Sequence, residues 1–280
     1  GYPISLLYVN EGQELLMKGG QVLSNAQYLQ QFKESQLGVA RYEALDSLAA
    51  REARAELTEL FPLAIKDSFA AVRERGLSLL QADSEWKEIL PGLEVEVYRL
   101  AEEDPENKVR AGALEVLTGW NPTAYKGAMM RLARDPSYLV AGAALMGLAL
   151  LEESKMETSW MESFEGESNF RIAVALAEYY ITNKVPGKGP WFEKTLSKLR
   201  GEGLYYFLGY YGSYYLEVGV EDKGAAIAKL VAVMKFNAKD YLRLGAFQAL
   251  LGFAAEEGVL AKLEEASAEE SSEELQSYYA

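Results

Sequence analysis

Apolar residues recur at helical spacing from Ser24 to the end of the chain, and a longer pattern is superimposed on them. A residue of the type that caps helices is followed six positions later by arginine, nine later by a small residue and ten later by an apolar one. The complete copies are Ser35 with Arg41, Ala44 and Leu45; Asp67 with Arg73, Gly76 and Leu77; Asp104 with Arg110, Ala113 and Leu114; and Asn237 with Arg243, Ala246 and Phe247. A fifth copy, at Asp135, has Ala141 in place of the arginine.

The first four cap residues along the chain lie about 31 to 37 residues apart, a period typical of stacked helix pairs. The interval between Asp135 and Asn237 holds about three such units, so we expect further units with helices at residues 167–181 and 203–218. Each unit needs a partner helix, and the candidates are residues 50–65, 85–101, 123–134, 155–164, 191–200 and 222–236. The sequence therefore predicts an all-α fold, an α-α superhelix of the HEAT/armadillo-like solenoid type with about six to seven helix pairs.

The first 20 residues differ from the rest of the chain. Residues 2–9 form an apolar run rich in β-branched and aromatic side chains, Asn10-Glu11-Gly12 is a turn signal, and residues 13–18 read as a second short strand. We expect residues 1–20 to be the β-strand tail of a preceding domain and residues 21–280 to be the solenoid. No initiator methionine precedes Gly1, so we expect the chain to be a segment of a longer polypeptide.

The repeated motif has a physical logic. An Asp, Ser or Asn before a helix can accept a hydrogen bond from its unpaired N–H groups, and Pro105 and Pro136 suit the first helical position. The small residue allows paired helices to approach closely. An arginine in the second turn can reach a cap carboxylate in its own or the adjacent repeat, which predicts a structural ladder. The ladder residues are Arg41, Arg73, Arg110 and Arg243, and direct contact with a ligand remains the alternative.

Residues 205–215 hold six tyrosines. The spacing of Tyr206, Tyr210 and Tyr214 places them along one side of a helix. They either fill a wide gap in the core, with their hydroxyls bonded at its edge, or form an interaction face for a peptide or protein.

Composition excludes several function classes. The net charge of −14 argues against nucleic acid or an anionic membrane as a partner, because both need a basic surface. The chain contains neither histidine nor cysteine, so it lacks an imidazole acid–base group, a histidine-dependent catalytic triad, the common zinc sites and disulfides. The glutamate-rich last 25 residues read as a solvated terminal cap. Nothing in the sequence indicates the cellular compartment.

Residues 25–49, with Arg41-Tyr42-Glu43-Ala44-Leu45 as the most distinctive part, resemble the start of the C-terminal HEAT-like helical domain of bacterial aminopeptidase N-type zinc proteases. Residues 2–18 are similar to the end of the β-domain that precedes it in that family. The resemblance implies a non-catalytic domain that covers the active-site chamber and helps to gate or hold peptide substrates. Its partners would be its own catalytic domain and the peptide.

The catalytic zinc motif of that family, H-E-x-x-H, cannot occur in a chain without histidine. We therefore expect no catalytic residue and no cofactor in this chain, with zinc held by a catalytic domain outside it. The alternative is a free-standing HEAT-like scaffold that binds a protein or peptide. An enzyme in its own right is the least supported interpretation.

Overall fold

The computed structural model describes residues 23–151, 156–270 and 272–279. Throughout these ranges every regular element is a helix and no strand occurs, so the fold is all-α, as the sequence predicts. The strands expected within residues 1–20 lie outside the described residues. The chain divides between Gly127 and Ala128 into two compact units.

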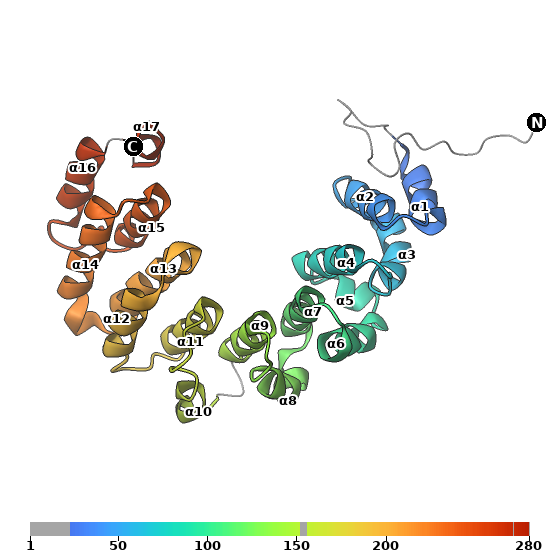
Figure 1. The fold of residues 1–280 in the computed structure, drawn as a ribbon, viewed down its shortest axis with the longest axis horizontal. Helices are drawn as coiled ribbons and strands as arrows, with labels where there is room; N and C mark the ends of the chain where they lie inside the picture. Colours follow the sequence, from blue (N-terminus) through green and yellow to red (C-terminus); the bar gives the residue numbers. More distant parts are fainter. Residues whose placement is uncertain (1–22, 152–155, 271, 280) are drawn as a thin grey trace, which may run out of the picture. The chain divides into compact units, whose positions relative to one another are not determined.

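The first unit is built from helices in two layers (Figure 1). These helices are α1 (Asn25–Glu34), α2 (Gly38–Ala49), α3 (Arg54–Ala64), α4 (Ala70–Ala82), α5 (Trp86–Ile89), α6 (Leu93–Glu103) and α7 (Asn107–Trp120). In one layer α2 packs against α4 and α4 against α7. In the other, α1 packs on α2, α3 on both α2 and α4, and α6 on α7. Each helix of the first layer is thus paired with one that precedes it in the chain. Helix α8 (Pro122–Leu132) spans the division between the units.

The second unit repeats this arrangement. Its elements are α9 (Tyr138–Ala149), α10 (Thr158–Glu162), α11 (Phe170–Thr182), α12 (Gly189–Lys198), α13 (Gly201–Glu217), the 3-10 helix η1 (Val220–Asp222), α14 (Lys223–Phe236), α15 (Asp240–Leu251), α16 (Val259–Glu269) and α17 (Glu273–Tyr279). Helices α9, α11, α13, α15 and α17 contact one another in succession, while α12, α14 and α16 each pack on the helix that follows them in this series.

The two units expected between Asp135 and Asn237 correspond to helices α11 and α13. The partner helix expected at residues 85–101 is instead split into α5 and α6. Pro91 explains the break, because proline disfavours the helical conformation of Leu90 before it and has no N–H to continue the hydrogen-bond ladder. The helix expected at residues 155–164 is shorter, since α10 covers only five residues.

The small residue of the repeated motif is buried in every copy, at Ala44, Gly76, Ala113, Ala144 and Ala246. At Gly76 the helices are so close that a Cβ atom would lie 3.3 Å from Cβ of Ala64 on α3. The following apolar residue is buried too, from Leu45 and Leu114 with no exposed surface to Phe247 with 6%. The motif therefore marks the line along which each helix meets its neighbours.

The expected capping geometry is wrong. Helices α2, α4, α7, α9 and α15 begin three residues after the motif's first residue, and their N-cap side chains make no capping hydrogen bond. The motif residue instead accepts a hydrogen bond from the N–H two residues later, as Asp67 does from Phe69 at 2.7 Å and Asp104 from Glu106 at 2.9 Å. Such a side-chain turn fixes the chain just before the helix. We therefore call Ser35, Asp67, Asp104, Asp135, Asn237 and Glu270 the turn residues. Asn169 differs from them, because it lies directly before α11 and caps that helix through the N–H of Arg171.

The prolines that follow two of these residues are also placed differently from the expectation. Pro105 and Pro136 lie in the turn, ahead of the N-cap residues Glu106 and Ser137, and not at the first helical position. The side chain of Asp104 or Asp135, directly before each proline, closes the turn. Two residues then separate that aspartate from the first residue of the helix.

Close helix packing predicts that alanine substitutions at two glycines of α13 change the free energy of unfolding in opposite directions. A Cβ atom at Gly203 would lie 2.7 Å from Cβ of Phe170 on α11, whereas one at Gly209 meets nothing within 4 Å. We expect Gly203→Ala to lower the free energy of unfolding by about 1–3 kcal/mol through overpacking. Gly209→Ala should raise it by about 0.5–1 kcal/mol through helix propensity. Urea unfolding followed by circular dichroism measures both, and equal stabilities of the two variants would contradict the packing described.

Candidate functional site

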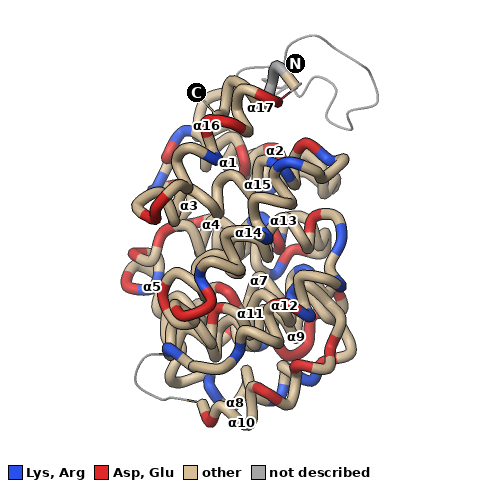
Figure 2. Tube along the Cα trace, turned by 90° about the vertical axis from the view of Figure 1, so that its left-hand side faces the viewer, with Lys and Arg blue, Asp and Glu red and all other residues tan. Residues whose placement is uncertain are grey.

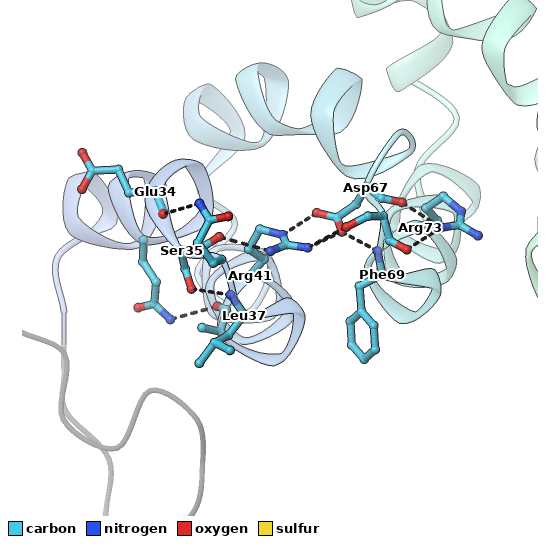
Figure 3. A network of polar contacts seen from close by, with 11 residues as sticks. Glu34, Ser35, Leu37, Arg41, Asp67, Phe69 and Arg73 are labelled. Atoms are coloured by element: carbon cyan, nitrogen blue, oxygen red, sulfur yellow. Dashed lines mark hydrogen bonds and ion pairs between the residues drawn. The ribbon is translucent and has the colours of Figure 1, made fainter.

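The motif arginines connect successive helix pairs. Arg41 donates from Nη1 to the carbonyl oxygen of Ser35 at 3.1 Å, and from Nε and Nη2 to the two carboxylate oxygens of Asp67, each at 2.6 Å (Figure 3). Arg73 repeats this geometry one unit later, with Nη1 on the carbonyl oxygen of Asp67 at 2.7 Å and its fork on Asp104 at 2.8 and 2.9 Å. Each arginine thus joins the turn before its own helix to the turn before the next.

The Arg73–Asp104 pair is almost completely removed from solvent. The side chain of Asp104 is 3% exposed and that of Arg73 is 10% exposed. Paired side chains of this kind carry a large desolvation cost that only good geometry offsets. The bidentate fork, together with the bond from the Glu106 N–H to Asp104, supplies that geometry.

The other two ladder residues differ from each other. Arg110 donates from Nε to the carbonyl oxygen of Ala101 at 3.3 Å. Arg243 binds as Arg41 and Arg73 do, with Nη1 on the carbonyl oxygen of Asn237 at 3.0 Å and its fork on Glu270 at 2.8 Å for each bond. The hydrogen bonds to Glu270 and its charge hold the pKa of Arg243 above its ordinary value.

Glu270 corrects the interpretation of the acidic C-terminal segment as a solvated cap. Acidic positions do gather on α16 and α17 (Figure 2), but the Glu270 side chain is only 5% exposed. Glu270 accepts from Arg243 and from the N–H of Ser272, and its carbonyl oxygen accepts from the Gln276 amide at 2.6 Å. Gln276 stands six positions after Glu270, where the motif has arginine. The glutamate run therefore contains a further copy of the repeat, which the sequence did not reveal because neither residue matches the expected type.

The chemistry of four turn residues follows the residue that faces them. Asp67, Asp104 and Glu270 are acidic, and each receives an arginine fork from the preceding unit. Asn237 is neutral and holds its turn with a carboxamide. Helix α13, the corresponding helix before Asn237, contains no arginine. A buried carboxylate occurs in these repeats where a cation neutralises it, which is the expected response to its desolvation cost.

The three tyrosines expected to share one face do not share one environment. Tyr206 is 55% exposed, Tyr210 is half-buried and Tyr214 is 1% exposed. Residues four apart advance about 40° around a helix, so Tyr206 and Tyr214 differ by about 80°. Tyr214 therefore belongs to the core, and only Tyr206 is presented to solvent to a large extent.

Four tyrosines form a buried group with their hydroxyls bonded at its edge: Tyr180, Tyr211, Tyr214 and Tyr215. The Tyr214 hydroxyl accepts from the N–H of Lys188 at 2.8 Å, and that of Tyr215 donates to the carbonyl oxygen of Gly189 at 3.2 Å. These bonds tie α13 to the N-terminal end of α12. Burial, with a hydrogen bond to Glu165, raises the pKa of Tyr180 well above its ordinary value; burial, with a hydrogen bond to Glu193, does the same for Tyr211.

A second set of aromatic residues lies at the solvent surface of the second unit. Phe170, Tyr206, Tyr205 and Tyr241, which we call the aromatic row, come from the N-terminal parts of α11, α13 and α15. Phe170 stacks on Tyr206 at 6.4 Å between ring centroids, Tyr206 meets Tyr205 edge-on at 5.4 Å, and Tyr205 meets Tyr241 edge-on at 6.3 Å. Tyr206 is 55% and Tyr241 42% exposed, while Phe170 and Tyr205 are half-buried.

Beside the aromatic row, a groove of about 320 Å³ runs between α13 and α15. It is lined by Tyr205, Tyr206, Gly209, Gly212, Ser213, Leu216, Gly245, Gln248, Ala249 and Gly252. Gly209 and Gly252 are exposed, whereas Gly245 is buried and makes room for the Tyr205 ring, since a Cβ atom there would lie 2.9 Å from that ring. Not one of these lining residues is charged.

Of the residues at this site, the tyrosine spacing in the sequence indicated only Tyr206. Tyr205 and Tyr241 come from different helices, and their pairing depends on how α13 and α15 pack. The glycine content of residues 201–212 was the available signal, because glycine inside a helix lowers its stability and is often found where another group approaches the backbone closely.

The remaining chemical possibilities are limited. Within the described ranges, no group of three His, Cys, Asp or Glu residues lies close enough together to hold a metal ion. None of the described helices combines the length and apolar character that crossing a bilayer requires. Comparison with models of known protein families and with curated protein sequences finds no match for this chain.

The buried ladder predicts that replacing a ladder arginine lowers the stability of the fold more than replacing an exposed arginine. Arg73→Met should lower the free energy of unfolding by about 3–5 kcal/mol, because the buried Asp104 carboxylate loses its partner. The matched control is Arg99→Met, since the Arg99 side chain is 48% exposed beside Glu96, and it should cost less than about 1 kcal/mol. The double variant Arg73→Met/Asp104→Asn should recover part of the loss. Chemical denaturation measures all three; equal losses in the two single variants would rule out a buried ladder.

The buried tyrosines predict a loss of stability at alkaline pH. Their folded-state pKa values are raised, so the protonated phenols stabilise the fold below the unfolded pKa of about 10, and this stabilisation is lost as pH rises through the raised values. Above pH 10 each such phenol should lower the free energy of unfolding by about 1.4 kcal/mol per pH unit.

Two measurements test this expectation. Denaturation between pH 8 and about 11 should show a smaller pH slope for Tyr180→Phe and Tyr211→Phe than for the unsubstituted chain. In an absorbance titration, the buried phenols should ionise only as circular dichroism reports unfolding. Their ionisation in a fully folded chain near pH 10 would contradict the expectation.

Proposed function

We propose that the helix pairs of this chain are HEAT-like repeats of an α-solenoid, and that the chain is a non-catalytic module that holds polypeptide. The repeat assignment is supported by the arginine ladder. In the units that begin at Ser35, Asp67 and Asn237, Nη1 of the arginine donates to the carbonyl oxygen of the unit's own turn residue, and its fork donates to the carboxylate of the next one. Solenoids of this kind present extended surfaces made from successive units and commonly use them for binding.

A holding role is supported further by the chemistry that the chain lacks. It has no histidine and no cysteine, and the buried side chains of Arg73 and Asp104 are bonded to each other. Histidine is the most frequent general acid or base in enzymes, and cysteine is an intrinsically strong nucleophile. The exposed aromatic row and the groove beside it are the features of the second unit best suited to contact with a polypeptide.

The context that we propose is the C-terminal helical domain of an aminopeptidase N-type zinc protease. The observation that carries this proposal is the resemblance at residues 25–49. Those residues form α1, which starts with a capping box between Ser24 and Gln27, and α2, in which Arg41 and Leu45 hold ladder and core positions. In this role the module would cover the active-site chamber and gate or hold peptides, and a catalytic domain outside this chain would hold the zinc.

The second candidate is a free-standing HEAT-like scaffold for a protein or peptide partner. The aromatic row favours it, because this surface needs no catalytic domain in order to bind a ligand. The two candidates share the solenoid and the holding role, and they differ in whether a peptidase is part of the same polypeptide.

The complete coding sequence tests the proposed context. We expect an H-E-x-x-H motif with a downstream glutamate on the N-terminal side of this module. In the full-length enzyme, deletion of residues 23–280 should leave the zinc content unchanged and alter the relative cleavage of long and short peptides by about tenfold or more. A polypeptide without the zinc motif would overturn the aminopeptidase context and leave the scaffold. Zinc-dependent peptidase activity of this chain alone would overturn the non-catalytic role.

A further inference from the structure

The aromatic row crosses three successive helices of one layer. Its rings come from α11, α13 and α15, and neighbouring rings contact each other, so the row is continuous across helices that are far apart in sequence. Large aromatic side chains partly exposed in such a row leave apolar area in water, and this arrangement is enriched where proteins bind other molecules.

The groove beside the row is electrically neutral on an acidic protein. The chain carries a net charge of −14, yet the groove lining contains only glycine, alanine, leucine, serine, glutamine and tyrosine. A charged ligand would lose its hydration here without gaining an opposite charge. The charge match therefore favours a ligand segment that is itself uncharged.

Polar groups in the lining are mostly able to donate hydrogen bonds. The Tyr205 hydroxyl donates to Oε1 of Gln248 at 3.4 Å, which leaves the Gln248 amide nitrogen as a donor toward a ligand. The hydroxyls of Tyr206 and Ser213 are further donors. Backbone carbonyl groups of a ligand can accept hydrogen bonds from these groups.

From these observations we propose that the α13–α15 groove and the aromatic row bind an uncharged, proline-rich polypeptide segment in the polyproline II conformation. Proline has no N–H, and the carbonyl groups of a polyproline II chain have no internal partners, so the segment presents acceptors to the donors of the groove. Its rings pack on aromatic faces, as in other recognition of proline-rich segments. This inference rests on the proposed polypeptide-holding function and names the kind of polypeptide.

The glycines of the groove offer a direct test. Gly209 lines the groove, and a Cβ atom there meets nothing within 4 Å, so Gly209→Leu should fold normally and fill the groove. Gly224 on α14 has equally open space and lies outside the groove lining, which makes Gly224→Leu the matched control. Circular dichroism and urea unfolding verify that both variants fold.

The probe is a fluorescent peptide of about ten residues, acetylated and amidated, built from proline, leucine and alanine around a P-x-x-P core. Fluorescence anisotropy with the whole chain should give saturable binding with a Kd below about 1 mM. Replacing the prolines by alanine, the variant Gly209→Leu, and the variant Tyr206→Ala/Tyr241→Ala should each weaken binding by about tenfold or more. Gly224→Leu should change it by less than about twofold.

Two kinds of result would overturn the inference. One is an absence of saturable binding of the proline-rich probe to the unsubstituted chain; the other is binding that Gly209→Leu leaves unchanged. The same titration with one acidic and one basic peptide of equal length distinguishes a failure of this inference from a failure of the polypeptide-holding function. Binding of a charged peptide in place of the proline-rich one would overturn this inference and leave the polypeptide-holding function intact.

Discussion

The interaction on which these repeats depend is the buried fork of an arginine between two turns. Nη1 of Arg73 holds the carbonyl oxygen of Asp67 before its own helix, while Nε and Nη2 hold the Asp104 carboxylate before the next one. Asp104 in turn accepts the N–H that closes its own turn. The position of each helix start is thereby tied to that of its neighbour. Because removing either partner would leave a buried charge, the contact fixes the register between successive helix pairs more strictly than apolar packing alone.

The cost of burying an unpaired carboxylate also explains why Asn237, one of the turn residues, is neutral. Asp67, Asp104 and Glu270 are acidic and face arginines, whereas Asn237 is neutral and follows a helix without an arginine. A carboxamide closes the same turn and has no net charge to desolvate. In the second unit, tyrosine hydroxyls bonded to the backbone around Lys188 and Gly189 connect α13 to its partner helix in place of an arginine.

Helix α13 has two roles because its tyrosines point in different directions. Tyr211, Tyr214 and Tyr215 fill the space against neighbouring helices, and Tyr205 and Tyr206 extend the aromatic row. Its glycines separate these roles: Gly203 and Gly212 permit close helix contacts, while Gly209 leaves the groove open. The polypeptide-holding function that we propose would use this groove and the aromatic row beside it.

The sequence by itself determined the helical period, the repeat length and the line of buried small residues, because these follow from local spacing on a 3.6-residue helix. It also singled out the arginines whose forks the structure places on Asp67, Asp104 and Glu270. It did not determine that the motif begins with a turn in place of a helix cap, that Glu270 and Gln276 continue the repeat, or that Tyr214 is buried while Tyr206 is exposed. Those properties depend on which neighbouring helix covers each side chain. Only the tertiary structure decided them, because Phe192 on another helix packs on Tyr214, while the contacts of Tyr206 leave much of its ring in water.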